Sequence, residues 1–182
     1  MLHSAASRVA ALDLGLVPGS DGKTAADMAA GGLDVLFLLG ADEIDVATGP
    51  FVVYIGTHGD RGAHRADVIL PAATYTEKSG TYVNTEGRVQ MTERAVFPPG
   101  EATEDWAIIR ALSAVLGHTL PFNSLAELRR ALYAEFPHMA RLDQIAAGSP
   151  DDMRRLAKAK VDTASALYGL PIREFYLTNP IA

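Results

Sequence analysis

Three short apolar runs constrain the fold of this chain more than any other feature of its sequence. They are "DVLFLL" at residues 34–39, "FVVYIG" at 51–56 and "DVIL" at 67–70. Continuously apolar runs of this length, bounded by Gly, Pro or charged residues, are typical of strands buried on both faces of a parallel sheet. The segments between the runs are loops rather than full helices, and strictly parallel neighbours need longer crossovers, so the strand order stays open. We expect an α/β fold.

Helical patterns lie on both sides of these runs. Apolar residues at three- to four-residue spacing predict an N-terminal helix; they are Leu2, Ala6, Val9 and Leu12. A second short helix is expected over residues 24–30, where Gly31 and Gly32 end it. The sheet is therefore expected to be layered with helices.

The strongest helical pattern covers residues 105–116. Thr103 is its predicted N-cap, and the acidic residues Glu104 and Asp105 favour the positive end of the helix dipole. Gly117 follows the last turn. One apolar stripe is expected to face the core; it consists of Trp106, Ile109, Leu112 and Leu116.

A further helix is predicted after Ser124. The letters "SLAE" have the form of a capping box with Glu127 at the third position, and Pro137 ends the helix. Its expected apolar face consists of Leu125, Leu128, Leu132 and Phe136. From Gly148 onward we expect a polar helix, and then an extended arm at the terminal "PIREFYLTNPIA". We divide the chain into an α/β module at residues 1–147 and a C-terminal helix and arm at 148–182.

Composition excludes several classes of function. The 22 acidic and 16 basic residues leave a formal net charge of -6, whereas nucleic-acid binding needs concentrated Lys and Arg. The chain has no cysteine, so it carries no disulfide, thiolate nucleophile or cysteine-ligated iron-sulfur cluster. Its longest apolar run, residues 35–41, is far shorter than the roughly 20 residues that span a bilayer. We expect small molecules or proteins as partners, without nucleic acid and without direct membrane insertion.

The segment "GTHGDRGAHRAD", residues 56–67, follows the second apolar run and is rich in Gly, His and Arg. Loops at the carboxyl ends of strands bind ligands in open α/β sheets. This segment nevertheless lacks the spacing of the dinucleotide fingerprint and the ending of the P-loop. We favour a tight charged loop, in which Arg61 and Arg65 meet carboxylates on a neighbouring surface, over a nucleotide site. His58 and His64 fit none of the common metal-ligand spacings, so no metal site is predicted.

The segment "EKSGTYVNTEGRVQ", residues 77–90, has a structural interpretation of its own. Ser79-Gly80 and Glu86-Gly87 supply turns, while "TYV" and "RVQM" are expected to form short strands. Its hydroxyls and Asn84 are expected to satisfy backbone groups. Glu77, Lys78 and Glu86 are the residue types of acid-base chemistry, but nothing in the sequence supplies them with a partner.

The longer stretch "ADVILPAATYTEKSGTYVNTEGRVQ", residues 66–90, resembles a segment of the molybdopterin-dependent oxidoreductase superfamily. That segment reads approximately ADVVLPA, then EK-G-T, then N-E-R-Q. The positions that match it are Lys78, Gly80, Thr81, Asn84, Glu86 and Arg88. The resemblance implies a Rossmann-like sheet layered with helices, with a mainly helical C-terminal portion.

Other stretches are similar to one branch of this superfamily, the large iron-sulfur subunit of respiratory complex I (NADH-quinone oxidoreductase). They include "LHSAASRVAALDLG", "VYIGTHGDRGAHRAD", "PPGEATEDWAIIRALS" and "FYLTNPIA". The resemblance implies the C-terminal part of that large subunit, without the N-terminal region that carries cysteine-ligated iron-sulfur clusters. Complex I transfers electrons from NADH to quinone and translocates protons. This branch is understood to have lost the molybdenum cofactor.

The resemblance therefore implies a structural module that holds no cofactor and no catalytic residue. Thr57, His58, Lys78 and Asn84 are its candidate vestigial cofactor residues. The implied partners are the rest of the large iron-sulfur subunit and other peripheral-arm subunits of complex I, with self-association of the isolated chain. The implied location is the cytoplasmic side of the bacterial inner membrane, or the matrix side in mitochondria. Two alternatives stay open: part of an active, formate dehydrogenase-like enzyme whose loops around Thr57 and Glu77 clasp the pterin phosphates, and a nucleotide-binding module.

Overall fold

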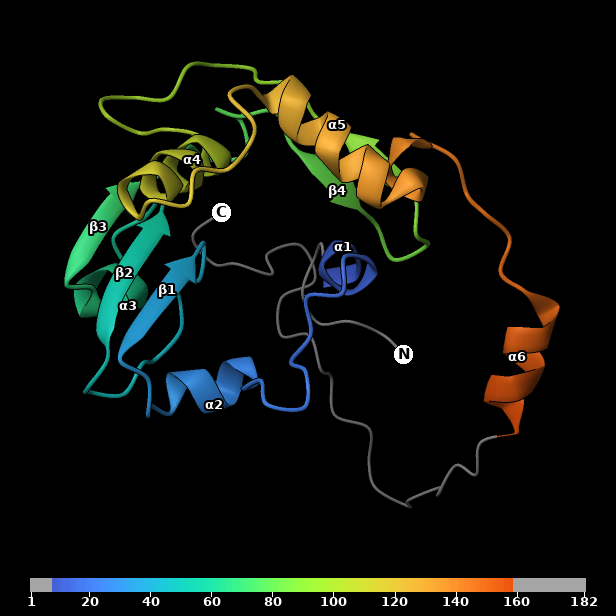
Figure 1. Cartoon of the computed structure of the whole chain (residues 1–182), viewed down its shortest axis with the longest axis horizontal. Helices are drawn as coiled ribbons and strands as arrows, with labels where there is room; N and C mark the ends of the chain where they lie inside the picture. The colour runs from blue at the N-terminus through green and yellow to red at the C-terminus, as the bar shows by residue number, and fades with distance from the viewer. Residues whose placement is uncertain (1–7, 159–182) are drawn as a thin grey trace.

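A three-stranded parallel sheet forms one half of the fold (Figure 1). The computed structural model describes residues 8–158. Strands β1 (Val35–Leu39), β2 (Phe51–Gly56) and β3 (Val68–Pro71) are neighbours in chain order. Both pairings are parallel, with Val35 opposite Phe51 and Val53 opposite Val68. The three apolar runs are thus strands of one parallel sheet, as the sequence predicts, and the chain has an α/β fold.

The connections between these strands are shorter than expected for parallel neighbours. Residues 40–50 join β1 to β2 without a helix, and residues 57–67 contain only the short helix α3 (Arg61–Arg65). The expectation that longer crossovers are needed is wrong here because the first loop itself covers the sheet. Its residues Ile44 and Val46 pack against the core of β1 and β2, where a crossover helix would otherwise lie.

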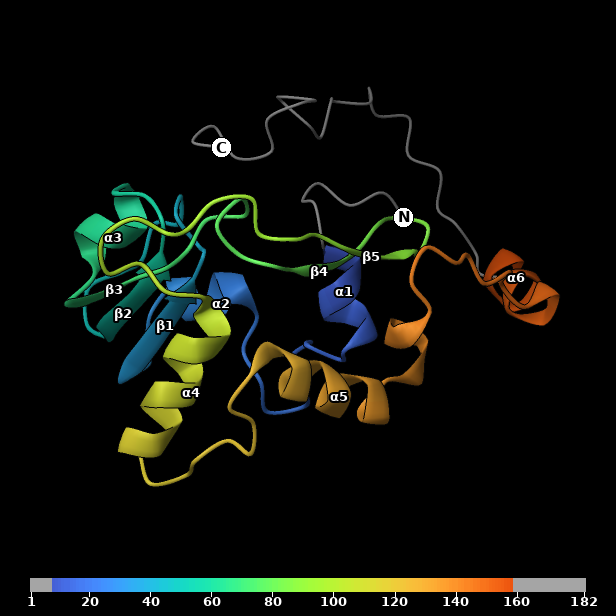
Figure 2. The same ribbon diagram turned by 90° about the horizontal axis from the view of Figure 1, so that it is seen from above.

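Helices lie on both faces of the sheet, but they do not cover all of it. Figure 2 shows α3 on one side and α4 (Asp105–Val115) on the other. On the first face a buried cluster contacts Met28 of helix α2 (Ala25–Ala29); its members are Leu36, Leu38, Val52, Tyr54 and Ala63. On the second face Ile108 of α4 packs against Val53, Ile55 and Ala72 of β2 and the end of β3.

Strand β1 is buried on one face only, and β3 has no buried residue, which corrects the expectation that all three runs are buried on both faces. Val35, Phe37 and Leu39 alternate with the buried Leu36 and Leu38 and are about half exposed. The physical reason is the position of α4, whose contacts are with β2 and the end of β3. Successive side chains of β1 point to opposite faces of the sheet, so every second residue is buried although the whole strand is apolar.

Helix α4 begins at Asp105, as predicted, but Thr103 is not its N-cap. Glu104 is the N-cap, and it makes no side-chain cap hydrogen bond. Thr103 instead forms a parallel bridge with Ala72: its N–H donates to Pro71 O (3.1 Å) and its carbonyl accepts from Ala73 N (2.9 Å). Two members of the predicted stripe, Ile109 and Leu116, are exposed, whereas Trp106 and Leu112 are half-buried; the residue that contacts the sheet core is Ile108. The extended backbone at Thr103 fixes this rotation of the helix.

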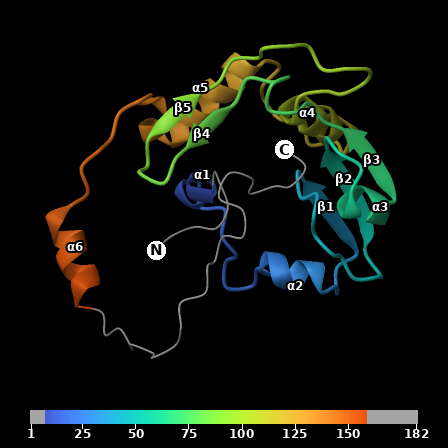
Figure 3. The same cartoon turned by 180° about the vertical axis from the view of Figure 1, so that it is seen from behind.

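A second core lies between a hairpin and α5 (Leu125–Glu135). Strands β4 (Thr81–Val83) and β5 (Val89–Met91) are antiparallel, as the turn signals predict, and Figure 3 shows α5 lying along them. The buried members of this core are Val83, Val89 and Met139. Met139 comes from η1 (Pro137–Ala140), and α1 (Arg8–Asp13) adds Val9 and Ala10.

The cap of α5 confirms the predicted start of this helix, but one of its hydrogen bonds differs from the predicted capping box. Ser124 Oγ accepts from Glu127 N (3.2 Å), as in a capping box. The Glu127 carboxylate accepts from Asn123 N (2.6 Å) rather than from the N-cap backbone. Of the predicted apolar face, Leu132 and Phe136 reach the second core.

Helix α6 (Pro150–Ala157) stands apart from the rest of the described chain (Figures 1 and 3). None of its residues is buried, and its acidic first turn and basic last turn match the predicted polar helix. The predicted arm at the C-terminus and the start of the predicted N-terminal helix lie outside the described residues. Within residues 8–158, no helix has the length and apolarity to cross a membrane.

Candidate functional site

The carboxyl end of β2 carries two of the four candidate cofactor residues. Thr57 Oγ1 lies 2.7 Å from His58 Nδ1, and both side chains are exposed. The segment that follows is partly helical rather than a loop, because Asp60 caps α3: Asp60 Oδ1 accepts from Gly62 N (3.1 Å). His64 therefore lies in the last turn of a helix. The expected tight, charged connection is present, with a helical turn inside it.

A buried tyrosine-aspartate pair lies at this end of the sheet. Tyr54 is 1% exposed and Asp42, in the loop after β1, is 7% exposed. The Tyr54 hydroxyl donates to Asp42 Oδ1 and lies 2.9 Å from His58 O. Burial, and then the hydrogen bond to Asp42, raise the pKa of Tyr54 above its usual value, so the phenol stays protonated at neutral pH.

Both arginines of the connection have acceptors at their Nη atoms within neighbouring loops of the chain itself. Arg61 Nη1 lies 2.8 Å from Asp45 Oδ2 in an exposed ion pair. Arg65 Nη2 donates to Pro50 O (2.8 Å), and its Nη1 lies 3.5 Å from Asp67 Oδ2. Carboxylates and a phenol therefore lie at the carboxyl ends of β1 and β2. The arginines of the connection bind acceptors in neighbouring loops.

The other two candidate residues lie elsewhere and have structural contacts of their own. Lys78 forms a half-buried ion pair with Asp105 at the start of α4. Asn84 Oδ1 accepts from Glu86 N and Arg88 N, both at 3.0 Å, and so closes the turn between β4 and β5. In the part of the chain that the structure describes, no hydrogen bond or ion pair joins Lys78 or Asn84 to Thr57 or His58.

Within residues 8–158, the histidines do not converge with other ligand residues. Among the residues described, 8–158, no group of three or more His, Asp or Glu side chains is placed to hold a metal ion. His58 faces Thr57, and His138 lies 3.6 Å from Asp13 on the other core. The structure thus brings together Thr57 and His58 but builds no metal-ligand cluster around them within that range.

We predict that Tyr54→Phe destabilises the chain by about 2 kcal/mol, because the variant removes a charge-assisted hydrogen bond from the buried Asp42 carboxylate. Urea unfolding followed by circular dichroism measures the effect. Tyr75→Phe is the matched control, since the Tyr75 side chain is exposed to solvent. Equal midpoints for both variants would show that the Tyr54–Asp42 hydrogen bond contributes nothing to stability.

Sequence reasoning missed two features of this part of the fold. The Asp42–Tyr54 pair has a signal that could have located it: Asp42 follows closely after an apolar strand, where parallel strands end together. Arg129 lines a pocket with Lys78 and Asp105. The sequence clue to its burial is its position in the helix. Arg129 is four residues after Leu125 and adjacent to Leu128 on the predicted apolar face of α5.

Comparison with known sequences defines the class of protein. Residues 1–115 match the family described as molybdopterin oxidoreductase, and the chain belongs to that family. The chain is 46% identical to the mitochondrial NADH-ubiquinone oxidoreductase 78 kDa subunit of Candida albicans, a match that covers 100% of this chain and 26% of the relative.

Two further relatives carry closely similar names. The mitochondrial 78 kDa subunit of Neurospora crassa is 41% identical over 100% of the chain and 25% of its own length. The NADH-ubiquinone oxidoreductase 75 kDa subunit of Reclinomonas americana is 46% identical over 80% of the chain and 21% of its own length. The chain spans about a quarter of the length of the curated relatives it matches.

Proposed function

We propose that this chain is a structural module of the 75/78 kDa type of iron-sulfur subunit in NADH-ubiquinone oxidoreductase, respiratory complex I. The observation that carries the proposal is identity of 41% and 46% along the entire chain to two subunits of that name. The parent assembly transfers electrons from NADH to quinone. This segment supplies fold and contact surface, while cysteine-ligated clusters belong to another region of the subunit, since the chain has no cysteine.

The module is proposed to hold no molybdopterin. A pterin cofactor carries phosphate, and phosphate sites are built from free backbone N–H groups and unpaired cations. Here the carboxyl ends of β1 and β2 place the Asp42 carboxylate against the buried Tyr54 hydroxyl, and the Asp60 carboxylate already accepts from Gly62 N as the cap of α3. Arg61 and Arg65 bind other acceptors, so the local charge disfavours an anion.

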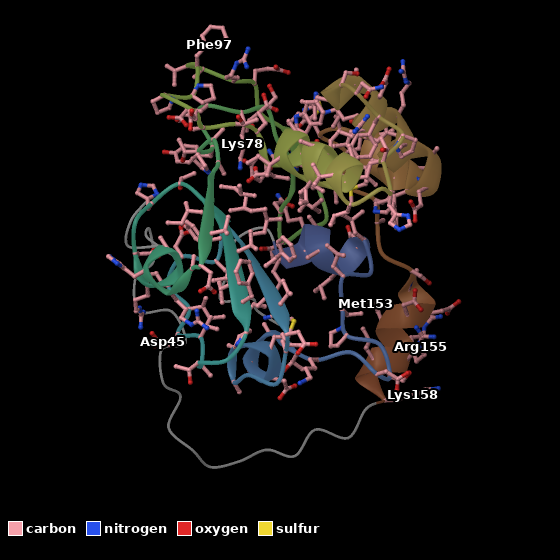
Figure 4. The ribbon with its side chains drawn as sticks, turned by 60° about the vertical axis from the view of Figure 1, so that its left-hand side comes forward. Asp45, Lys78, Phe97, Met153, Arg155 and Lys158 are labelled. Carbon is pink, nitrogen blue, oxygen red and sulfur yellow. The ribbon has the colours of Figure 1, made fainter. Side chains whose placement is uncertain are left out.

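Exposed apolar surface supports the proposed partners. Val35, Phe37 and Leu39 of β1 and Phe51 of β2 form an apolar face about half exposed. Parallel sheets are usually covered on both faces, so the rest of the subunit is proposed to complete a Rossmann-like layering here. Phe97 is 79% exposed at the tip of the loop before α4 (Figure 4), with Arg94 4.3 Å from its ring centre, and is proposed to contact a neighbouring peripheral-arm subunit. Two relatives are named mitochondrial, and a peripheral place in the assembly is proposed because no helix within residues 8–158 could cross a membrane.

The proposal predicts the metal and pterin content of the intact subunit. We expect iron in stoichiometric amount, and molybdenum and pterin far below one per subunit, in the purified complex. Mass spectrometry of the metals and fluorescence of the oxidised pterin measure the contents, with a formate dehydrogenase as the positive control. Stoichiometric pterin in the region of this chain would overturn the cofactor-free assignment, and would favour the active molybdopterin enzyme instead.

A second experiment tests the role in assembly independently of whether the chain holds a cofactor. The isolated chain is expected to self-associate through its exposed apolar face. Co-expression with the rest of the subunit is expected to replace these self-contacts by a one-to-one complex. Sedimentation velocity measures both states. A chain that stays monomeric at high concentration and does not bind the rest of the subunit would contradict the module assignment whatever its pterin content.

A further inference from the structure

Strand β1 is an edge strand, with a neighbouring strand on one side only. The sheet order is β1-β2-β3, so β1 lies at the end of the sheet opposite β3 (Figures 1 and 3). At the start of the pairing, Phe51 N donates to Asp34 O (2.9 Å). At its end, Gly40 N donates to Ile55 O (2.8 Å). These two hydrogen bonds show that the even-numbered residues of β1 direct their backbone groups toward β2.

The odd-numbered residues of β1 direct their backbone groups away from β2. In a strand of a parallel pair, the N–H and C=O of one residue point to the same side, and successive residues alternate. Val35, Phe37 and Leu39 therefore each present an N–H and a C=O that no described strand pairs. The side chains of these residues are also about half exposed. The outer edge of β1 thus combines unpaired backbone groups with apolar side chains.

The opposite edge of the sheet is protected in ways that β1 is not. Strand β3 ends at Pro71, which has no N–H, and the Pro71 carbonyl already accepts from Thr103 N (3.1 Å). By contrast, residues 35–41 include no proline and no charged residue. Proline and charge are the usual protections of an exposed strand edge, so β1 is open to pairing with another strand.

Unpaired backbone groups specify their partner more narrowly than an apolar surface does. Donors and acceptors repeated at every second residue match another extended strand. Strand β1 matches itself: when two copies run antiparallel with Phe37 opposite Phe37, Val35 lies opposite Leu39. Each of these opposed pairs exchanges two hydrogen bonds, about six in total. Asp34 then lies opposite the uncharged Gly40, so no like charges oppose each other.

We propose that two copies of this chain pair antiparallel through the outer edge of β1, which continues the sheet from one copy into the other. The side chains of Val35, Phe37 and Leu39 from both copies form one apolar strip on the same face. A two-fold axis at Phe37 uses the open edge of each copy, so the contact closes at a dimer. The inference rests on the proposed function in one respect, because it specifies the self-association expected when the rest of the subunit is absent.

Single cysteines locate the contact, because the chain has no cysteine and each variant cross-links only between copies. Phe37→Cys is expected to cross-link under mild oxidation, since opposed residues of antiparallel strands lie about 5.5 Å apart between Cα atoms, within disulfide reach. Phe51→Cys is the control for stacking of the exposed faces. Phe51 is 49% exposed beside Val35, but it lies one strand further in, roughly 14 Å or more from its equivalent in the dimer.

Ile69→Cys is the control for the opposite edge, because Ile69 is 53% exposed on β3. Phe37→Cys is expected to form the disulfide dimer at least about tenfold faster than either control. Cross-linking of Phe37→Cys that is no faster than that of Ile69→Cys overturns the proposal. Fastest cross-linking of Phe51→Cys also overturns it, and assigns the self-association to stacking of the apolar faces.

Phe37→Lys tests the same contact without oxidation. It places two ammonium groups opposite each other in the dimer, while the backbone of residue 37 takes no part in the hydrogen bonds to β2. Sedimentation velocity is expected to show a dimer weakened about tenfold or more. Ile69→Lys, at similar exposure on β3, is expected to dimerise like the parent chain. Equal dimerisation of the two folded variants, or a parent chain that stays monomeric at high concentration, contradicts the proposal.

Two further measurements keep the test decisive. Circular dichroism shows whether both lysine variants are folded, and if Phe37→Lys is not, the cross-linking rates decide alone. Binding to the co-expressed rest of the subunit is measured separately. If Phe37→Cys fails to cross-link while the chain binds the rest of the subunit, edge pairing is wrong and the module assignment stands. If the cross-link forms and the chain does not bind the rest of the subunit, the dimer stands and the module assignment fails.

Discussion

Gly62→Ala is expected to destabilise the chain by about 2–3 kcal/mol, although alanine is the better helix former. Gly62 lies in α3, packed against the loop after β1. A Cβ atom at this position would lie 2.7 Å from Ala41 O and 3.1 Å from Asp42 O. Both neighbours are backbone atoms, so the contact cannot be relieved by rotating a side chain. Moving α3 away would also lengthen the hydrogen bond from Gly62 N to Asp42 O, now 2.8 Å.

Gly59→Ala is the matched control for this variant. Gly59 lies in the same connection, three residues earlier, and a Cβ atom there would meet nothing within 4 Å. We expect its free energy of unfolding to stay within about 0.5 kcal/mol of the parent chain. Urea unfolding of both variants, followed by circular dichroism, gives the comparison. If the two substitutions had the same effect, close packing of α3 on the loop after β1 would not be a source of stability.

Met139→Ala is expected to cost about 3 kcal/mol, the second large effect. Met139 is 2% exposed and packs with Val83 and Val89 of the hairpin. Shortening it leaves a cavity between the hairpin and α5, lined by Leu132 and Phe136. The loss combines the transfer free energy of the removed atoms with the cost of that cavity.

Met153→Ala makes the same chemical change where no core is present. Met153 is 67% exposed on α6. Its replacement is expected to change the unfolding free energy by less than about 0.5 kcal/mol. Thermal unfolding recorded at a sheet-sensitive and a helix-sensitive wavelength also tests whether the two cores unfold together. A drop in midpoint of similar size for both variants would mean that the second core is not packed as described.

Local signals were sufficient to predict most elements of the fold. The turn pairs at Ser79-Gly80 and Glu86-Gly87 predicted the β4–β5 hairpin, and Ser124 predicted the start of α5. Both signals act within a few residues, so their physics is complete in the local sequence. The burial of β1 was not predictable in this way, because it depends on where α4 lies across the sheet, far along the chain.

The same limit applies to Thr103 and to the site. Thr103 has the chemistry of an N-cap, and no local feature shows that its backbone will instead bridge to Ala72. Arg129 and Arg130 are chemically identical neighbours, yet the folded chain buries two donors of Arg129 while the Arg130 side chain is 74% exposed. The charged character of the connection after β2 was predictable from its composition, whereas the acceptors of Arg61 and Arg65 lie in the loop before β2, 16 and 15 residues away, and no local signal indicates them.

The short loops between the three parallel strands also bear on how the chain folds. All of the sheet lies between Val35 and Pro71, and its two connections are residues 40–50 and 57–67. Closing loops of this length costs little chain entropy, whereas parallel sheets with helical crossovers have higher contact order and form slowly. Strand pairing here needs nothing beyond Pro71. The sheet is thus positioned to assemble during synthesis, before α4 has left the ribosome to cover it.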